Sequence, residues 1–71
     1  MLGFYIKHSQ YNKYLGFYDK NKVWTDKDKA YWYHTQVSAE SAARVIKKNN
    51  KYRAIKLIIV DRLDVEVAQL D

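Results

Sequence analysis

Residue types that could carry catalysis are few in this chain and are poorly placed for it. The chain has two histidines, His8 and His34, and no cysteine. Catalysis needs a nucleophile beside a base, a metal with its ligands, or paired carboxylates in a cleft. His34 and Thr35 are the only neighbouring base and hydroxyl, and in an extended strand adjacent side chains point to opposite faces. We therefore expect no catalytic residues.

Carboxylates, phosphate loops and metal ligands lead to the same expectation. Asp26 and Asp28, and likewise Asp64 and Glu66, share a face at a spacing of two. Lysines surround the first pair, which favours a solvated turn. Two glycines are too few for a glycine-rich phosphate loop, and the histidines have no second ligand pair nearby. We expect a protein that is not an enzyme and that holds no metal and no cofactor.

Positive charge is concentrated in the body of the chain. The net charge is +5, yet residues 61–71 are acidic, with Asp61, Asp64, Glu66 and Asp71 against Arg62. A basic body can bind nucleic acid or an acidic protein surface. The candidate nucleic-acid residues form a stripe along a helix and the strand after it: Arg44, Lys47, Lys48, Lys51, Arg53 and Lys56. The plainer interpretation is that these cations complement a helix dipole and that Glu40 pairs with Arg44.

Aromatic residues are the strongest sign of binding. Seven tyrosines, two tryptophans and two phenylalanines are a heavy load for 71 residues. Plausible core positions at strand spacing are Phe4, Tyr14 or Phe17, Trp24 and Trp32. The remaining tyrosines cannot all be inside, and tyrosine is enriched at interface hot spots, although it also suits the solvent side of a sheet. The candidate protein-binding residues are Tyr5, Tyr11, Tyr18, Tyr31, Tyr33 and Tyr52.

Length and composition indicate one small domain over residues 1–71. A core of this size contributes roughly 3–5 kcal/mol, and without cysteine there is no disulfide to add to it. Aromatic packing or self-association must supply the remaining stability, so a homodimer is one hypothesis. The apolar stretch Met1–Ile6 is too short for a signal peptide or a membrane span. We expect a cytoplasmic protein that does not enter a membrane.

Alternation and turn residues predict several short strands before a helix. Strands are expected at 3–9, 13–18 and 23–25, with a further short extended piece at 30–34. Polar turns separate them at 9–13 and 19–22, and residues 25–28 are expected to form a turn or one helical turn. Gly16 inside the second strand indicates a bulge or a close backbone approach.

One helix is expected to begin at Ser38. Serine is a good N-cap, and Glu40 would then lie in the first turn, where a negative charge suits the helix dipole. The alanines and an isoleucine fall on one face, which predicts close packing against a sheet. Asn49 and Asn50 are expected to end the helix, because asparagine can adopt the left-handed cap.

The last segment carries apolar residues at every odd position from Ile55 to Val67, with Asp61 as the only interruption. We expect one long strand, bent or bulged near Asp61. The alternative is a hairpin with a two-residue turn at Asp61, which would place Ile59 opposite Asp64. An overhanging strand pairs readily with another chain, so the candidate self-association residues are Leu63, Val65 and Val67. The expected fold is α+β: a small antiparallel sheet, β-β-β-(β)-α-β, packed by one helix.

The pattern also resembles a class of small proteins encoded by phages and prophages of Gram-positive bacteria. It consists of Phe4-Tyr5-Ile6-Lys7, Lys13-Tyr14-Leu15, Val23-Trp24-Thr25-Asp26, Lys29-Ala30 and a short alanine-rich helix, and it covers residues 4–60. The resemblance implies an accessory role in a bacterial host cell, by binding host machinery such as a defence system, or phage nucleic acid. The leading hypothesis is a non-enzymatic accessory protein that binds a host or phage protein. A nucleic-acid-binding module and a self-assembling structural protein are the alternatives.

Overall fold

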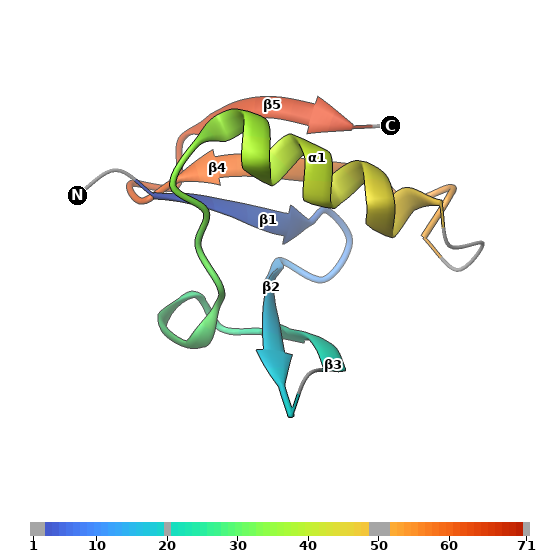
Figure 1. The fold of residues 1–71 in the computed structure, drawn as a ribbon, viewed down its shortest axis with the longest axis horizontal. Helices are drawn as coiled ribbons and strands as arrows, with labels where there is room; N and C mark the ends of the chain where they lie inside the picture. Colours follow the sequence, from blue (N-terminus) through green and yellow to red (C-terminus); the bar gives the residue numbers. More distant parts are fainter. Residues whose placement is uncertain (1–2, 20, 49–51, 71) are drawn as a thin grey trace.

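Five strands and one helix make up the protein in a computed structural model that describes residues 3–19, 21–48 and 52–70. The strands are β1 (Phe4–His8), β2 (Lys13–Tyr18), β3 (Asn21–Thr25), β4 (Leu57–Asp61) and β5 (Glu66–Leu70). They form one antiparallel sheet in the order β3-β2-β1-β4-β5. A short 3-10 helix, η1 (Lys27–Lys29), follows β3, and α1 (Gln36–Lys47) lies on one face of the sheet (Figure 1). The expected α+β fold is therefore confirmed.

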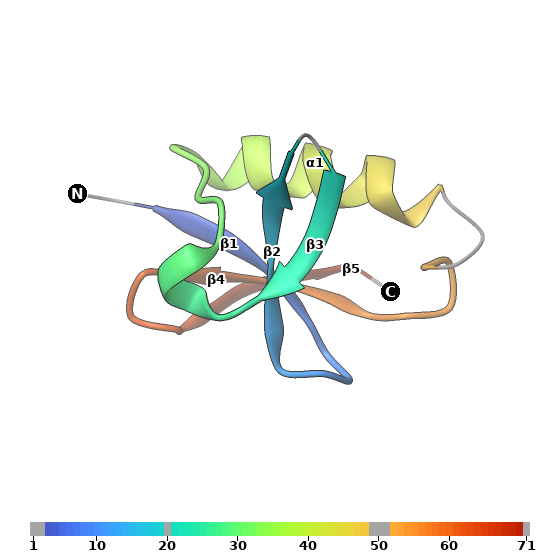
Figure 2. The same ribbon diagram turned by 90° about the horizontal axis from the view of Figure 1, so that it is seen from below.

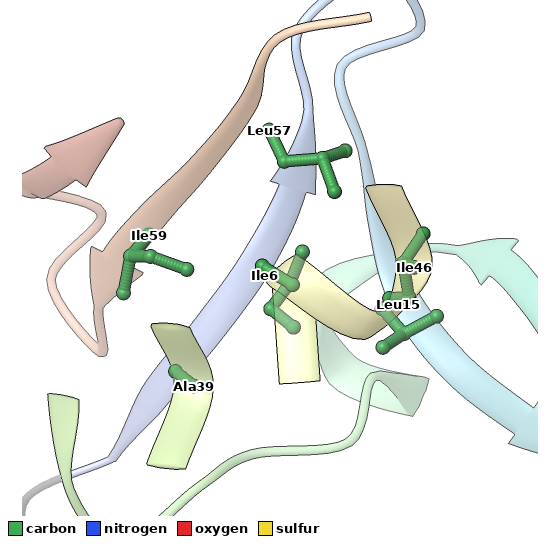
Figure 3. Close-up of a cluster of buried hydrophobic side chains, with 7 residues drawn as sticks. Ile6, Leu15, Ala39, Ile46, Leu57 and Ile59 are labelled. Carbon is green, nitrogen blue, oxygen red and sulfur yellow. The ribbon is translucent and has the colours of Figure 1, made fainter. Parts of the chain in front are cut away.

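The hydrophobic core lies between α1 and the sheet (Figure 3). The sheet contributes Ile6, Leu15, Leu57 and Ile59, all at most 1% exposed. The helix contributes Ala39, Ala43 and Ile46. Because alanine has a short side chain, α1 can lie close to β1, β4 and β5, against which it packs. The predicted alanine-faced packing is thus confirmed.

The expected aromatic core is only partly present. Phe4 and Trp24 pack against the core cluster, but Trp32 is half-buried beside His34 and Gly3 and is not a member. Of the two alternatives at the second strand, Tyr14 is the buried one. It lies on the face of the sheet away from α1, because Leu15, its neighbour, points into the core. Phe17 shares the helix-side face with Leu15 but is 46% exposed.

The helix begins three residues earlier than expected. Thr35, not Ser38, is the N-cap, and its Oγ1 accepts a hydrogen bond from the backbone N–H of Ser38 at 3.1 Å. Glu40 consequently lies in the second turn, where it pairs with Arg44 at 3.7 Å. Thr and Ser are both good N-caps, and the earlier cap lengthens the helix at its N-terminal end. The predicted end at residues 49–50 lies outside the described residues.

The prediction of one long C-terminal strand is wrong. β4 and β5 form an antiparallel hairpin with Leu57 opposite Leu70 and Ile59 opposite Ala68, so the two-residue turn of the alternative is also wrong. Residues 62–65 form the loop, which the carboxylate of Asp61 stabilises by accepting the backbone N–H groups of Leu63 and Val65. Asp64 takes the positive φ of 67° that a tight turn needs. A side-chain acceptor and an aspartate in this conformation replace the missing glycine.

The extended piece at 30–34 forms a wedge between β1 and β2 rather than a full strand. Phe4 and Tyr33 exchange two backbone hydrogen bonds, of 2.9 and 2.8 Å, and the N–H of Tyr31 donates to the carbonyl of Leu15 at 2.9 Å. The ladder between β1 and β2 is correspondingly short, with the register Lys7 opposite Tyr14 and His8 opposite Lys13. Figures 1 and 2 show β2 turned steeply away from β1.

Gly16 marks a close backbone approach, one of the two roles expected for it. A Cβ atom there would lie 2.9 Å from Cγ2 of Thr25 and 3.2 Å from the backbone oxygen of Lys29. The η1 segment therefore covers β2 at this point.

The substitution Gly16→Ala is expected to destabilise the protein by about 1–3 kcal/mol, because the backbone of η1 cannot move away without disturbing β3. Urea unfolding followed by circular dichroism measures the loss. The control is Ser41→Ala on the exposed side of α1, for which we expect a change within about 0.5 kcal/mol. Equal stability of Gly16→Ala and the wild type would contradict the close approach.

Candidate functional site

The six tyrosines predicted to bind a protein do not form one surface. Tyr31 and Tyr33 lie together with Phe17. Tyr11 and Tyr52 flank His8. Tyr5 packs edge-on against Tyr14, with ring centroids 6.2 Å apart, on the face of the sheet away from α1. Tyr18 is 76% exposed at the end of β2.

The first group, which we call the aromatic ladder, consists of Phe17, Tyr31 and Tyr33. The rings of Phe17 and Tyr31 meet edge to face at 5.3 Å, and those of Tyr31 and Tyr33 at 4.8 Å. Phe17 and Tyr31 are 46% and 49% exposed, whereas Tyr33 packs against the core. Backbone hydrogen bonds of the wedge hold Tyr31 and Tyr33 in place. The ladder is therefore a partly exposed aromatic surface on a fixed backbone. Phe17, which we placed in the core as an alternative to Tyr14, belongs to it.

The second group surrounds His8, which is fully buried. Tyr11 stacks on the imidazole with centroids 4.3 Å apart and an interplanar angle of 21°. Trp24 meets the imidazole edge to face at 5.0 Å, and its indole N–H donates to the hydroxyl of Tyr52 at 3.2 Å. Sequence reasoning treated His8 only as an isolated candidate for chemistry. The signal for its burial was its position two residues after Ile6 on the core-facing side of β1.

The hydrogen bonding of His8 determines its protonation. Its Nδ1 accepts the backbone N–H of Gln10 at 3.1 Å, so the proton of the neutral ring is on Nε2. Nε2 is buried and has no hydrogen-bond partner among the described residues. Burial lowers the pKa of His8 below 6.5, because a charged imidazolium would lose its hydration. The ring is therefore neutral at pH 7.

Burial of neutral His8 is expected to make stability fall in mild acid. The unfolded chain takes up a proton near pH 6.5, whereas the folded chain does so only at a lower pH. The His8 contribution is thus complete above pH 6.5 and is lost as the pH falls below it. Unfolding free energies of the wild type and His8→Phe, compared between pH 7.5 and 5.5, measure the effect. A wild type no more pH-sensitive than His8→Phe would contradict it.

A polar cluster on the face of the sheet away from α1 joins three elements. The hydroxyl of Tyr14 donates to Oδ1 of Asp64 at 2.7 Å, and the ammonium of Lys27 lies 3.7 Å from the same carboxylate. Lys27 also donates to the backbone oxygen of Arg62 at 2.7 Å and lies 5.3 Å from the ring centre of Tyr5. Sequence reasoning missed this cluster, since residues 14 and 64 are 50 positions apart.

The cluster shifts the pKa of both partners. Burial, and then the bond to Asp64, raises the pKa of Tyr14 to about 12. The bond from Tyr14 lowers the pKa of Asp64 despite partial burial, and Lys7 and Lys27 act in the same direction. The cluster attaches the β4–β5 loop to β2 and to η1. The loop and η1 thereby cover part of the face of the sheet that α1 does not cover.

Removing the Tyr14 hydroxyl is expected to weaken the attachment of the β4–β5 loop to β2 and to destabilise the fold. Tyr14→Phe should cost about 1 kcal/mol of unfolding free energy and raise the pKa of Asp64. In the wild type the bond stabilises the fold below about pH 10 and is lost as the pH rises toward 12, where the folded Tyr14 ionises. NMR titration of the tyrosine rings measures the pKa, and in Asp64→Asn it should fall below 12. Tyr18→Phe is the control, and an equal loss of stability there would contradict the assignment.

The predicted basic stripe is divided between two segments. Arg44 is exposed on α1 and Lys48 is exposed directly after it, while the ammonium of Lys47 donates to the backbone oxygen of Ile55. Arg53 and Lys56 are exposed on the segment between α1 and β4. Lys51 lies outside the described residues. The Lys47 bond brings the end of α1 next to that segment. The part of the predicted stripe at the end of α1 therefore lies near the part that follows the helix.

The three predicted self-association residues are all exposed. Leu63 and Val65 lie in the β4–β5 loop and are 74% and 55% exposed, and Val67 is 37% exposed on β5. The strand β5 is at one edge of the sheet. Pairing of this edge with a second chain stays a prediction.

The part of the chain that the structure describes contains no group of three residues able to hold a metal ion. No pocket forms among these residues, and no helix in the described ranges is long and apolar enough to cross a membrane. Comparisons with protein-family models, with curated proteins and with solved structures gave no match.

Proposed function

We propose that this chain is a non-catalytic binding protein that recognises a partner protein through the aromatic ladder. The exposure of Phe17 and Tyr31 carries the proposal, because each remains nearly half open to solvent while in contact with the other. Large aromatic residues at the centre of an interface supply most of its binding energy. A backbone already fixed by the wedge reduces the entropy lost on binding.

The surroundings of the ladder indicate the character of the partner. Lys22 is the cross-strand partner of Phe17 on β3, and it is exposed. A lysine beside exposed rings favours a partner surface that combines apolar and acidic groups. The resemblance to small phage and prophage proteins supports a host or phage protein as this partner. We propose that the chain, by binding this partner, inhibits a bacterial defence system.

The double substitution Phe17→Ser/Tyr31→Ser tests the proposal. Loss of a single hot-spot residue costs at least about 2 kcal/mol, or about 30-fold in affinity, and losses at neighbouring hot spots are not additive. The double variant should therefore bind the partner more than about 30-fold more weakly. The partner is isolated from a bacterial lysate with the immobilised wild type, purified, and its dissociation constant measured with each variant.

Tyr18→Ser is the matched control, since Tyr18 is 76% exposed, follows Phe17 in β2 and belongs to no described ring pair of the ladder. It should bind like the wild type. Thermal melts of all variants report on folding. A purified partner that binds the double variant as tightly as the wild type would exclude the ladder as the binding surface.

A further inference from the structure

A second aromatic surface lies at a different place, on the loop between β1 and β2. Tyr11 is 64% exposed, yet one face of its ring is stacked on the buried imidazole of His8 at 4.3 Å. An exposed tyrosine usually rotates freely, whereas here the stack holds the ring. The turn is fixed as well, because the N–H of Asn12 donates to the carbonyl of His8 at 3.1 Å and Asn12 has a φ of 55°.

The support under Tyr11 is itself rigid. His8 is in T-shaped contact with Trp24, with ring centroids 5.0 Å apart, and Trp24 is bonded through its indole N–H to Tyr52. His8, Trp24 and Tyr52 come from β1, β3 and the segment before β4. The ring of Tyr11 is therefore a preorganised flat surface with its outer face toward solvent.

Basic residues converge on the same end of the molecule. The N–H of Ser9 donates to the backbone oxygen of Lys56 at 3.3 Å, which joins the loop to the exposed basic segment at 52–56. Lys13 lies opposite His8 in the sheet and is partly neutralised by Asp26 at 2.7 Å. Arg53 follows Tyr52, whose ring lies 6.4 Å from His8. Figure 1 shows this loop and the segment after α1 toward the same end of the sheet.

We propose that the outer face of Tyr11 is a stacking site for a base of single-stranded nucleic acid, with Lys56 and Arg53 contacting the neighbouring phosphates. A flat ring around which the described residues form no pocket suits a planar ligand, since every base has a π-face. A duplex keeps its bases stacked on one another and does not offer that face. The site is independent of the aromatic ladder, so it adds a second activity to the proposed partner binding.

Fluorescence anisotropy with labelled oligothymidine and oligouridine tests the site at low salt. The wild type should bind at least one of them, and which one distinguishes DNA from RNA as the source of the base. Tyr11→Ala should weaken binding about 5- to 150-fold, whereas Tyr11→Phe, which keeps the ring, should bind like the wild type. Because Tyr11→Ala also uncovers His8, its folding is checked by a thermal melt, and Tyr11→Phe tests the ring in an undisturbed fold.

The charge contribution has its own control. Lys56→Gln should lower the slope of log affinity against log salt by about 0.7, the share of one phosphate contact. Arg44→Gln removes the same charge from the outer side of α1 and should leave the slope unchanged. The ladder variant Phe17→Ser/Tyr31→Ser should also bind normally, which separates this site from the proposed protein interface.

Four results would overturn the stacking site. They are no binding by the wild type at low salt, equal binding by Tyr11→Ala, a loss in Tyr11→Phe as large as in Tyr11→Ala, and a change in Arg44→Gln equal to that in Lys56→Gln. A shift of the His8 ring signals in NMR on adding oligonucleotide to the wild type would support stacking directly. The same shift on adding a duplex of equal length would contradict the preference for single strands.

Discussion

The wedge of residues 30–34 between β1 and β2 is the constraint on which the rest of the structure depends. Backbone groups of Phe4 and Leu15 that neighbouring strands would otherwise satisfy bond to Tyr33 and Tyr31 instead. The short β1–β2 ladder then lets β2 and β3 turn away from the other strands (Figure 2). Since α1 packs on β1, β4 and β5, the helix-side face of β2 and β3 must be covered by other groups. Aromatic side chains cover it, which explains why so many are needed in so short a chain.

The two faces of the sheet are therefore covered in different ways. On the helix side, alanines allow close packing over aliphatic strands, and rings extend the core beyond the end of the helix. On the other side, the β4–β5 loop and η1 meet over Tyr14 through the Asp64 carboxylate and Lys27. A small domain without disulfides gains little from its aliphatic core alone. Connections between loops that are distant in sequence, such as the bond from Tyr14 to Asp64, add to the long-range pairing of β1 with β4.

The sequence predicted the strands and the face of the helix because their periodicities are local. The C-terminal hairpin was only the alternative prediction, and with too short a turn, because the apolar residues of β5 are not on the expected face. Val65 and Val67 continue the odd-numbered alternation of β4 but are exposed, while Ala68 and Leu70 pack against the core cluster. A bulge between β4 and β5 changes the parity, and an exposed valine at an edge is not distinguishable in sequence from a buried one. The sequence predicted only that several tyrosines must be exposed. It did not predict which of them come together in the ladder, since that depends on the backbone bonds of the wedge.

His8 is buried in the core and at the same time stacks on the exposed ring of Tyr11. A leucine there would fill the space but would leave the N–H of Gln10 without its side-chain acceptor, and it would offer Tyr11 no ring to stack on. The imidazole provides both, at the cost of burying Nε2 without a described partner. One face of the imidazole stacks on Tyr11, and Trp24 meets the imidazole at an interplanar angle of 86°. Tyr11, His8, Trp24 and Tyr52 therefore form a continuous series of contacts that joins the β1–β2 loop to the core.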